Sequence, residues 1–519
     1  MKQSAVMFPT APGGASFTVT LPNEQATVRF ARDIAAALEP GDLVTLSGAL
    51  GAGKTTFARA LIRQLAADEA IEVPSPTFTL MQTYELPRFA LVHADLYRLS
   101  GAAELAELGF DDLPEGTVIL LEWPDRAGGL LPPDRLAVTF ALAPQLGAEE
   151  RNARVVGYGA FAARVERMAP VRAFLDESGF GAARRRRMQG DASTRIFERL
   201  TLDGRTAVLM DAPRRPDGPP VRDGKSYSAI AHLAEDVVPF VAIAAALRAH
   251  KISAPAILDA DLERGLVIME DLGDERIVGG DRPAPIEACY AAAVDLLASL
   301  HNQKLPEVLP VAPHLDYRLP PYDMAAFLIE AQLLLDWYLP AAGVVASAET
   351  RESFLALWRE ALTPAVEAPP TWVLRDYHSP NLLWLPERED IARIGVLDFQ
   401  DALLGPAAYD VASLLQDARV DVPESLEVAL LGRYVRARRA GDAHFDAAAF
   451  TRLYATLTAQ RATKIVGIFA RLDRRDGKPQ YLRHIPRLWA YLQRSLMHPA
   501  LAPLRAWYAN VRVKPRPGP

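Results

Sequence analysis

The sequence predicts an α/β P-loop fold followed by an α+β, two-lobed fold. Three observations predict this order. Short apolar strands alternate with helical patterns up to residue 141, a glycine-rich motif stands between one strand and one helix, and beyond residue 165 strands come first and helices follow. Strand–helix alternation is typical of a mainly parallel sheet, whereas strands followed by helices are typical of an α+β fold.

Length, composition and charge limit the function classes. At roughly 100–200 residues per domain, 519 residues correspond to two to four domains. Hydrophobic residues make up 50% and charged residues 23%, which excludes a mostly disordered chain. The single cysteine, Cys289, excludes a disulfide scaffold and a cysteine-based metal site.

The net charge of −7 is unevenly distributed, with 10 basic against 19 acidic side chains in residues 1–150 and 47 against 45 in the remainder. No global basic field would attract nucleic acid, so we expect no strong direct nucleic-acid binding. The N-terminus lacks the apolar core of a signal peptide. The longest uncharged apolar stretch, residues 237–247, is far shorter than the ~20 residues that span a bilayer. We therefore expect a cytoplasmic protein without a membrane partner.

The pattern of elements predicts where the domains divide. Strands are expected at residues 43–47, 90–93, 118–121 and 136–141, with a helix at 57–65. After residue 165, a helix is expected at residues 171–178, strands at 196–202 and 206–210, and a strand–loop–strand segment at 372–399. The basic run Arg184 to Arg187 is expected to be a solvated loop. We predict a P-loop ATPase domain at residues 1–145, a linker at 146–165, a kinase-like domain at 166–505 and a tail at 506–519. Within the kinase-like domain, the small lobe is expected at about 166–275 and the helical lobe at about 276–505.

A complete phosphate-binding motif follows the strand at residues 43–47. The segment GALGAGKT fits G-x-x-x-x-G-K-[ST] at every fixed position. Glycines let backbone N–H groups surround a phosphate, and the N-terminus of the next helix adds its positive dipole end. We predict that Lys54 reaches the β- and γ-phosphates of ATP and that the Thr55 hydroxyl binds Mg²⁺. The predicted nucleotide-binding residues here are Gly48, Gly51, Ala52, Gly53, Lys54, Thr55 and Thr56.

Two acidic residues at strand ends, Asp95 and Glu122, are expected to complete this site by holding Mg²⁺ or orienting a water. Together with SPTFTL (75–80), HADLYRL (93–99) and LEWPDR (121–126), the P-loop resembles the TsaE family, the small ATPase subunit of bacterial tRNA threonylcarbamoyladenosine synthesis. The resemblance implies Asp95 as a magnesium ligand, Glu122 as important for hydrolysis and Thr77 in a switch-like loop. It also implies action on a TsaB–TsaD partner complex. Trp123 is expected mainly in the core.

A second site is predicted in the C-terminal part. In LRDYHSPNLL, Asp376 and Asn381 have the D-x-x-x-x-N spacing of a kinase catalytic loop, and the apolar strand VLDF ends at Asp398. Asp376 would accept the proton of an attacking hydroxyl, while Asn381 and Asp398 would hold Mg²⁺ on the transferring phosphate. Upstream, Ser193 and Arg195 lie where a phosphate-covering loop is expected, and Glu270 ends an apolar strand that leads to a hinge for adenine.

One kinase feature is absent, because Met210 stands where a phosphate-binding lysine is usual. Four segments resemble AmgK, the N-acetylmuramate/N-acetylglucosamine anomeric kinases of the aminoglycoside phosphotransferase superfamily. They are AVLMDAP (207–213), LRDYHSPNLLWL (374–385), residues 397–419 and residues 460–487. The resemblance covers roughly residues 166–500. It implies an amino-sugar substrate phosphorylated at its C1 hydroxyl with ATP, and the same roles for Asp376, Asn381 and Asp398. Arg195 is a candidate replacement for the lysine.

Substrate contacts and competing functions remain open at this point. Acidic candidates for sugar hydroxyls are Tyr322-Asp323, Glu330, Asp401 and Asp410, and basic candidates for the lactyl carboxylate of N-acetylmuramate are Arg461, Lys464 and Arg471, although most of these fit solvated helix faces equally well. The favoured hypothesis is a bifunctional ATPase and amino-sugar kinase. The alternatives are a kinase for an aminoglycoside or choline-like alcohol, and a non-catalytic pseudokinase that regulates the ATPase.

Overall fold

The computed structural model describes residues 14–99, 104–105, 107–143, 150–188, 195–215 and 217–511. It forms two units, Met1–Asp211 and Ala212–Pro519.

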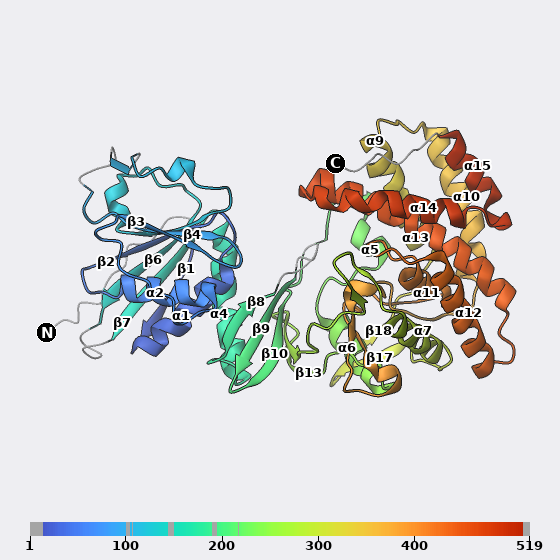
Figure 1. Cartoon of the computed structure of the whole chain (residues 1–519), viewed down its shortest axis with the longest axis horizontal. Helices are drawn as coiled ribbons and strands as arrows, with labels where there is room; N and C mark the ends of the chain where they lie inside the picture. Colours follow the sequence, from blue (N-terminus) through green and yellow to red (C-terminus); the bar gives the residue numbers. More distant parts are fainter. Residues whose placement is uncertain are drawn as a thin grey trace. The chain divides into compact units, whose positions relative to one another are not determined.

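A seven-stranded mixed sheet organises the first unit (Figure 1), with strand order β1-β7-β6-β2-β5-β4-β3. The neighbours β6, β2, β5 and β4 run parallel, whereas β1, β7 and β3 join antiparallel at the two edges. Every strand expected from the sequence in this part is present. The strands are β1 Ala15–Leu21, β2 Leu43–Gly48, β3 Met81–Glu85, β4 Ala90–Asp95, β5 Val118–Glu122, β6 Arg135–Leu142 and β7 Arg151–Tyr158.

Within the described residues, three helices pack on this sheet: α1 (Glu24–Ala37), α2 (Lys54–Ala66) and α4 (Phe161–Glu177). The side chain of Asn23 caps α1 by accepting a hydrogen bond from the Ala26 N–H at 2.9 Å. Aromatic rings join the layers, since Phe57 lies 5.2 Å from Phe30 and 5.4 Å from Phe140 between ring centroids. This core fixes α2, and therefore the loop before it, on the central strands.

The stretch expected to be a linker contains a strand. Residues 151–158 form β7, which pairs along its full length with β6 and β1. Ala153 and Val155 are fully buried in the core, so their two-residue spacing turns one face of β7 toward it. The expected helix at 171–178 is also longer, because α4 begins at Phe161 and continues through Pro170.

The basic run is also a strand, so the expectation of a solvated loop is wrong. β8 (Arg184–Arg187) pairs antiparallel with β9 (Ile196–Leu202), which pairs with β10 (Arg205–Asp211). Arg185 is buried between acidic partners, with Glu198 Oε2 at 2.6 Å and Asp33 Oδ1 at 2.6 Å. Burial alone would lower the pKa of Arg185, but the charges of Glu198 and Asp33 outweigh it and raise that pKa.

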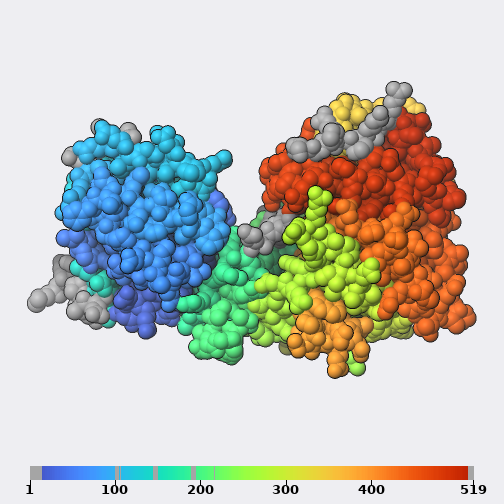
Figure 2. All heavy atoms as spheres, in the orientation of Figure 1, coloured from blue at the N-terminus to red at the C-terminus, as the bar shows by residue number. Residues whose placement is uncertain are grey.

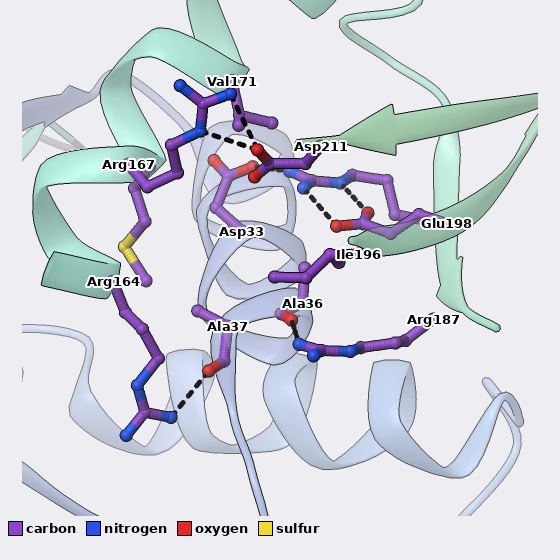
Figure 3. Close-up of a pocket in the computed structure, with 12 residues that line it drawn as sticks. Asp33, Ala36, Ala37, Arg164, Arg167, Val171, Arg187, Ile196, Glu198 and Asp211 are labelled. Carbon is purple, nitrogen blue, oxygen red and sulfur yellow. Dashed lines mark hydrogen bonds and ion pairs between the residues drawn. The ribbon is translucent and has the colours of Figure 1, made fainter. Parts of the chain in front are cut away.

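Strands β8 to β10 are thereby joined to α1 and α4 of the P-loop fold. Asp33 on α1 also accepts hydrogen bonds from Arg172 on α4, and Arg167 binds Asp211 at 2.7 Å. Asp33, Arg167 and Asp211 line a small cavity of about 60 Å³. Figure 3 shows these side chains, together with Arg187, which donates to the Ala36 carbonyl at 3.1 Å. This network lies within the first unit, which ends at Asp211.

The second unit is mostly helical, with small antiparallel strand pairs. In Figure 2 the orange and red atoms of its later helices form much of its visible surface. The long helix α13 packs against α8, α11 and α14. Gly467 permits close approach, because a Cβ there would lie 2.4 Å from the Leu333 carbonyl carbon. The main helices are α5 Tyr227–Ala231, α6 Val238–Ala249, α7 Glu287–His301, α8 Met324–Leu333, α10 Ala348–Val366, α11 Ala408–Leu415, α12 Glu424–Gly441, α13 Ala447–Asp476, α14 Ile485–Ser495 and α15 Ala502–Asn510.

The strand pairs of the second unit include the expected strand–loop–strand segment. This segment and the residues after it contain four short strands, in which β19 pairs with β22 and β20 pairs with β21. Among the described residues, no helix is long and apolar enough to cross a bilayer. The strands are β11 Pro220–Arg222, β12 Lys225–Ser226, β13 Ile257–Asp261, β14 Leu266–Glu270, β15 Val278–Gly279, β16 Ala284–Pro285, β17 Val308–Ala312, β18 Leu315–Arg318, β19 Thr371–Val373, β20 Leu382–Trp384, β21 Ile394–Val396 and β22 Leu403–Gly405.

We predict that Asp33→Asn lowers the free energy of unfolding of the first unit by about 1–3 kcal/mol, because Arg185 and Arg172 lose a half-buried anionic partner, although Arg185 keeps Glu198. Urea denaturation of the full chain measures this. Glu69→Gln is the matched control, since its pair with Arg184 is largely exposed and contributes little. Equal stability of Asp33→Asn and wild type would show that the network does not hold β8 to α1.

Candidate functional site

The P-loop joins the end of β2 to the start of α2. Gly48, Gly51 and Gly53 have φ angles of 139°, 76° and 105°. A Cβ on Gly48 would lie 2.4 Å from the Phe140 carbonyl oxygen, so this position requires glycine. Because α2 begins at Lys54, the N–H groups of Thr55 and Thr56 lie in its first turn, where no intrahelical acceptor is available. The loop therefore has the backbone geometry of an anion cradle, with buried Ala52 inside it.

Lys54 is held at this loop by backbone and aromatic contacts. Its ammonium donates to the carbonyls of Gly48 at 2.9 Å and Ala49 at 3.1 Å, and lies 3.8 Å from the centroid of the Trp123 ring. Burial lowers the pKa of Lys54, and the nearby charges of Glu122 and Asp95 oppose that shift. Trp123 was expected mainly in the core, but the structure places its ring against the P-loop lysine.

The two strand-end acids lie side by side but have different partners. Asp95 and Glu122 are in register on the parallel strands β4 and β5. Thr55 Oγ1 donates to Glu122 Oε1 at 3.2 Å, whereas Asp95 Oδ2 accepts a hydrogen bond from Thr77 Oγ1 at 3.0 Å. Thr55, predicted to bind Mg²⁺, thus contacts Glu122 in this structure, and Asp95 contacts Thr77. The hydroxyl and carboxylate oxygens are the donors that Mg²⁺ prefers, so these residues fit that ion.

Sequence reasoning missed His93, two residues before Asp95 on β4. Its Nε2 lies 3.0 Å from Glu122 Oε1, and both side chains are buried. The alternation along β4 places His93 and Asp95 on the same face of the strand, which is the signal that could have identified it. His93 fixes the orientation of the Glu122 carboxylate beside Thr55.

The second site brings together the three residues predicted for phosphoryl transfer. Asp376 and Asn381 lie in the turn between β19 and β20, and Asp398 follows β21 with a φ of 54°. Asn381 Nδ2 donates to the Asp376 carbonyl at 3.0 Å and lies 3.5 Å from Asp398 Oδ2. The Asn381 amide oxygen and the Asp398 carboxylate suit Mg²⁺ in the same way as the first site.

Buried carboxylates hold the backbone of this loop. Asp410 accepts hydrogen bonds from the N–H groups of Leu374 at 2.6 Å and Arg375 at 2.9 Å, and Asp417 binds Ser379. Burial raises the pKa of Asp410 to about 7, against the lowering effect of those two donors. Asp410 was a candidate for sugar hydroxyls, but its oxygens are already used by the loop backbone.

Glu330, another acidic candidate for the sugar, is fully buried and bound on all sides. Its carboxylate pairs with Arg375, lies 2.7 Å from Lys464 Nζ, and accepts hydrogen bonds from Tyr322 Oη at 2.5 Å and Gln460 Nε2 at 3.2 Å. Burial alone would raise the pKa of Glu330, but the charges of Lys464 and Arg375 outweigh it and lower that pKa to about 2. Glu330 therefore joins α8, the catalytic loop and α13.

The remaining acidic candidates also have local partners. Asp323 caps α8 through the Ala326 N–H at 2.8 Å and faces His232 at 3.2 Å. Asp401 accepts a hydrogen bond from the Ala234 N–H at 2.6 Å. These contacts favour the structural role that the sequence analysis kept open for them.

The predicted nucleotide contacts of the kinase part are distributed as follows. Ser193 lies outside the described residues, while Arg195 directly precedes β9. Met210, in β10, is 1% exposed, which suits its apolar side chain. Glu270 ends β14 and pairs with Arg248 at 3.1 Å and Arg388 at 2.6 Å. The Glu270 side chain is thus engaged with arginines, and its backbone N–H donates to the Ala256 carbonyl at 2.8 Å.

Comparison with known proteins assigns each part of the chain. The family model for threonylcarbamoyl adenosine biosynthesis protein TsaE matches residues 21–152, and the phosphotransferase enzyme family model matches residues 184–450. The TsaE protein of Rickettsia felis is 42% identical over 120 residues, covering 23% of this chain and 70% of that protein. The chain belongs to both families. The N-acetylmuramate/N-acetylglucosamine kinase of Caulobacter vibrioides is 40% identical over 356 residues, covering 66% of this chain and 96% of that protein.

A second relative agrees with this assignment. The N-acetylmuramate/N-acetylglucosamine kinase of Pseudomonas aeruginosa is 36% identical over 331 residues, covering 62% of this chain and 86% of that protein. The predicted fold class is confirmed, with a TsaE-type α/β P-loop part and a kinase-like phosphotransferase part. The chain is an enzyme that combines two ATP-using families. The TsaE match ends within β7, which agrees with the place of that strand in the first sheet.

We predict that Glu330→Gln lowers the free energy of unfolding at pH 7 by about 3–5 kcal/mol, because Arg375 and Lys464 are left without a counter-charge. The stabilisation by the wild-type carboxylate is complete above its unfolded pKa near 4.5 and is lost as the pH falls toward its folded pKa of about 2. The difference between variant and wild type should therefore shrink below pH 4.5.

Urea denaturation between pH 7 and pH 3 measures this difference. Glu360→Gln, at an exposed position of α10, is the matched control and should follow the wild type at every pH. A difference between Glu330→Gln and wild type that stayed constant over this range would contradict a charged Glu330.

Proposed function

We propose that the chain is a bifunctional enzyme. Its TsaE part hydrolyses ATP in support of tRNA adenosine-37 threonylcarbamoylation, and its phosphotransferase part phosphorylates the anomeric hydroxyl of N-acetylmuramate or N-acetylglucosamine. The observation that carries the second assignment is the identity of 40% across 96% of a kinase named for these two sugars. We propose that the boundary between the two functions lies between residues 152 and 184, and the change from one family match to the other supports this.

In the kinase part, each residue of the loop has one proposed task. The Asp376 carboxylate takes the proton from the C1 hydroxyl as its oxygen attacks the γ-phosphorus of ATP, and ADP leaves with the β–γ bridging oxygen. Burial alone would raise the pKa of Asp376, but the charge of Lys464, followed by those of His378 and Arg375, lowers it. Asp376 therefore remains a carboxylate at neutral pH. Asn381 and Asp398 would hold Mg²⁺, which neutralises charge on the transferring phosphate.

In the ATPase part, the P-loop amides and Lys54 bind the phosphates, and Thr55 with Glu122 and Asp95 would hold Mg²⁺ or orient the attacking water. The His93 contact keeps the Glu122 carboxylate turned toward Thr55. We propose a TsaB–TsaD-like complex as partner of this part, a role in peptidoglycan recycling for the other, and a cytoplasmic site for both. Neither the aminoglycoside or choline-like kinase nor the pseudokinase alternative is favoured by a specific observation.

We expect Lys54→Ala to reduce ATP turnover measured with TsaB–TsaD by about 100-fold or more, because the phosphates lose their positioned cation. The same protein should phosphorylate N-acetylmuramate at the wild-type rate, which serves as the internal control for folding. Unchanged ATP turnover would refute the ATPase assignment.

For the kinase part, Asp376→Asn should lower kcat for N-acetylmuramate and N-acetylglucosamine by about 100- to 10,000-fold, because the general base is lost. Asp390→Asn is the matched control, at an exposed position with a φ of 47° that asparagine also adopts. ADP release should be assayed over both sugars, an aminoglycoside and choline. Wild-type turnover of the aminoglycoside or choline, with neither sugar phosphorylated, would refute the proposed substrate.

A further inference from the structure

Arg461 is a buried cation whose guanidinium has no partner within the described part of the chain. It lies on α13, is 5% exposed, and makes no hydrogen bond or ion pair with any described residue. None of its guanidinium nitrogens is cut off from solvent, although the residue as a whole is largely buried. A guanidinium that reaches solvent and makes no hydrogen bond with the protein is open to a carboxylate or phosphate that enters from solvent. Such a side chain is therefore a candidate for binding an anionic ligand.

The neighbouring basic residues of α13 do not share this property. Lys464 lies 2.7 Å from Glu330 Oε1 and 3.2 Å from Tyr409 Oη. Arg471 lies against the ring of Tyr227, with its guanidinium carbon 5.0 Å from the ring centroid. Of the three basic residues that the sequence nominated for a substrate carboxylate, these two are thus engaged with the protein, and Arg461 is not.

Arg461 is also close to the catalytic loop. Gln460 and Lys464, on the same stretch of α13, both bind Glu330, and Glu330 binds Arg375, which adjoins Asp376. The positive charge of Arg461 acts on Asp376, Asp410 and His378 alike, so its guanidinium lies within electrostatic range of the proposed base. A ligand anion bound by Arg461 would therefore lie within electrostatic range of Asp376.

We propose that Arg461 binds the lactyl carboxylate of N-acetylmuramate and so distinguishes this acidic sugar from neutral N-acetylglucosamine. This inference rests on the proposed kinase function. The lactyl ether is attached at C3 of the same ring whose C1 hydroxyl is proposed to meet Asp376, so a single substrate carries one group for each of the two side chains. Guanidinium pairs a carboxylate through two parallel hydrogen bonds, which fixes the orientation of the sugar as well as its charge. The competing occupant is the transferring phosphate.

The test is steady-state kinetics of the full chain with Mg-ATP and each sugar. In Arg461→Met, kcat/KM for N-acetylmuramate should fall about 10- to 100-fold, as expected for loss of a charged hydrogen-bonded pair. The value for N-acetylglucosamine should stay within about threefold of wild type, which also shows that the variant folds. Arg461→Lys should recover part of the N-acetylmuramate activity. Arg452→Met, at an exposed arginine of the same helix, should leave both sugars unaffected.

Two results would overturn the inference. An equal loss with both sugars in Arg461→Met would assign the guanidinium to the transferring phosphate, and no loss with either sugar would remove it from the site. Failure of the proposed function looks different, because the wild-type chain would then phosphorylate neither sugar.

Discussion

A buried carboxylate, that of Glu330, is the interaction on which the kinase part depends. It has no access to water, so its charge is tolerable only because Arg375 and Lys464 meet it directly and Tyr322 and Gln460 donate to it. Since these partners come from different segments, one ion fixes the catalytic loop against α8 and α13. Asp410 adds a second restraint through the loop amides, and Asp376 keeps a defined position between them.

The need to pair buried charges also explains the organisation of the first unit. Asp33 and Glu198 neutralise Arg185, and this pairing makes β8 part of a body with the P-loop fold. At the P-loop itself, Glu122 is buried with His93 and Thr55, while Asp95 is buried with Thr77. In each of these places a buried charged side chain has a partner within the protein, and the pair stabilises the fold. Arg461, which has no such match among the described residues, is the charge that we assign to a ligand.

Local patterns in the sequence predicted much of this arrangement. The glycine-rich loop, the acids at the ends of β4 and β5, and the spacing from Asp376 to Asn381 each have a local chemical reason, so each could be recognised without a structure. The family resemblances extended these motifs to whole domains, and the family matches agree with them. The roles assigned to individual residues within those motifs stay predictions.

What the sequence did not predict depends on contacts between distant segments. Glu330 and Asp410 are acidic residues of the kind that bind sugar hydroxyls. Only their contacts with Arg375, which lies 45 residues after Glu330 and 35 residues before Asp410, show that they hold the loop. The basic run at β8 and the strand β7 were missed for the same reason, since acidic partners on α1 and the pairing with β6 and β1 decide their structure.

The most direct measurement of the central claim is a crystal structure of the full chain with N-acetylmuramate and a non-hydrolysable ATP analogue. The account predicts the C1 hydroxyl within hydrogen-bond distance of Asp376 and the lactyl carboxylate on the Arg461 guanidinium; a sugar bound with its carboxylate in solvent and C1 away from Asp376 would contradict it.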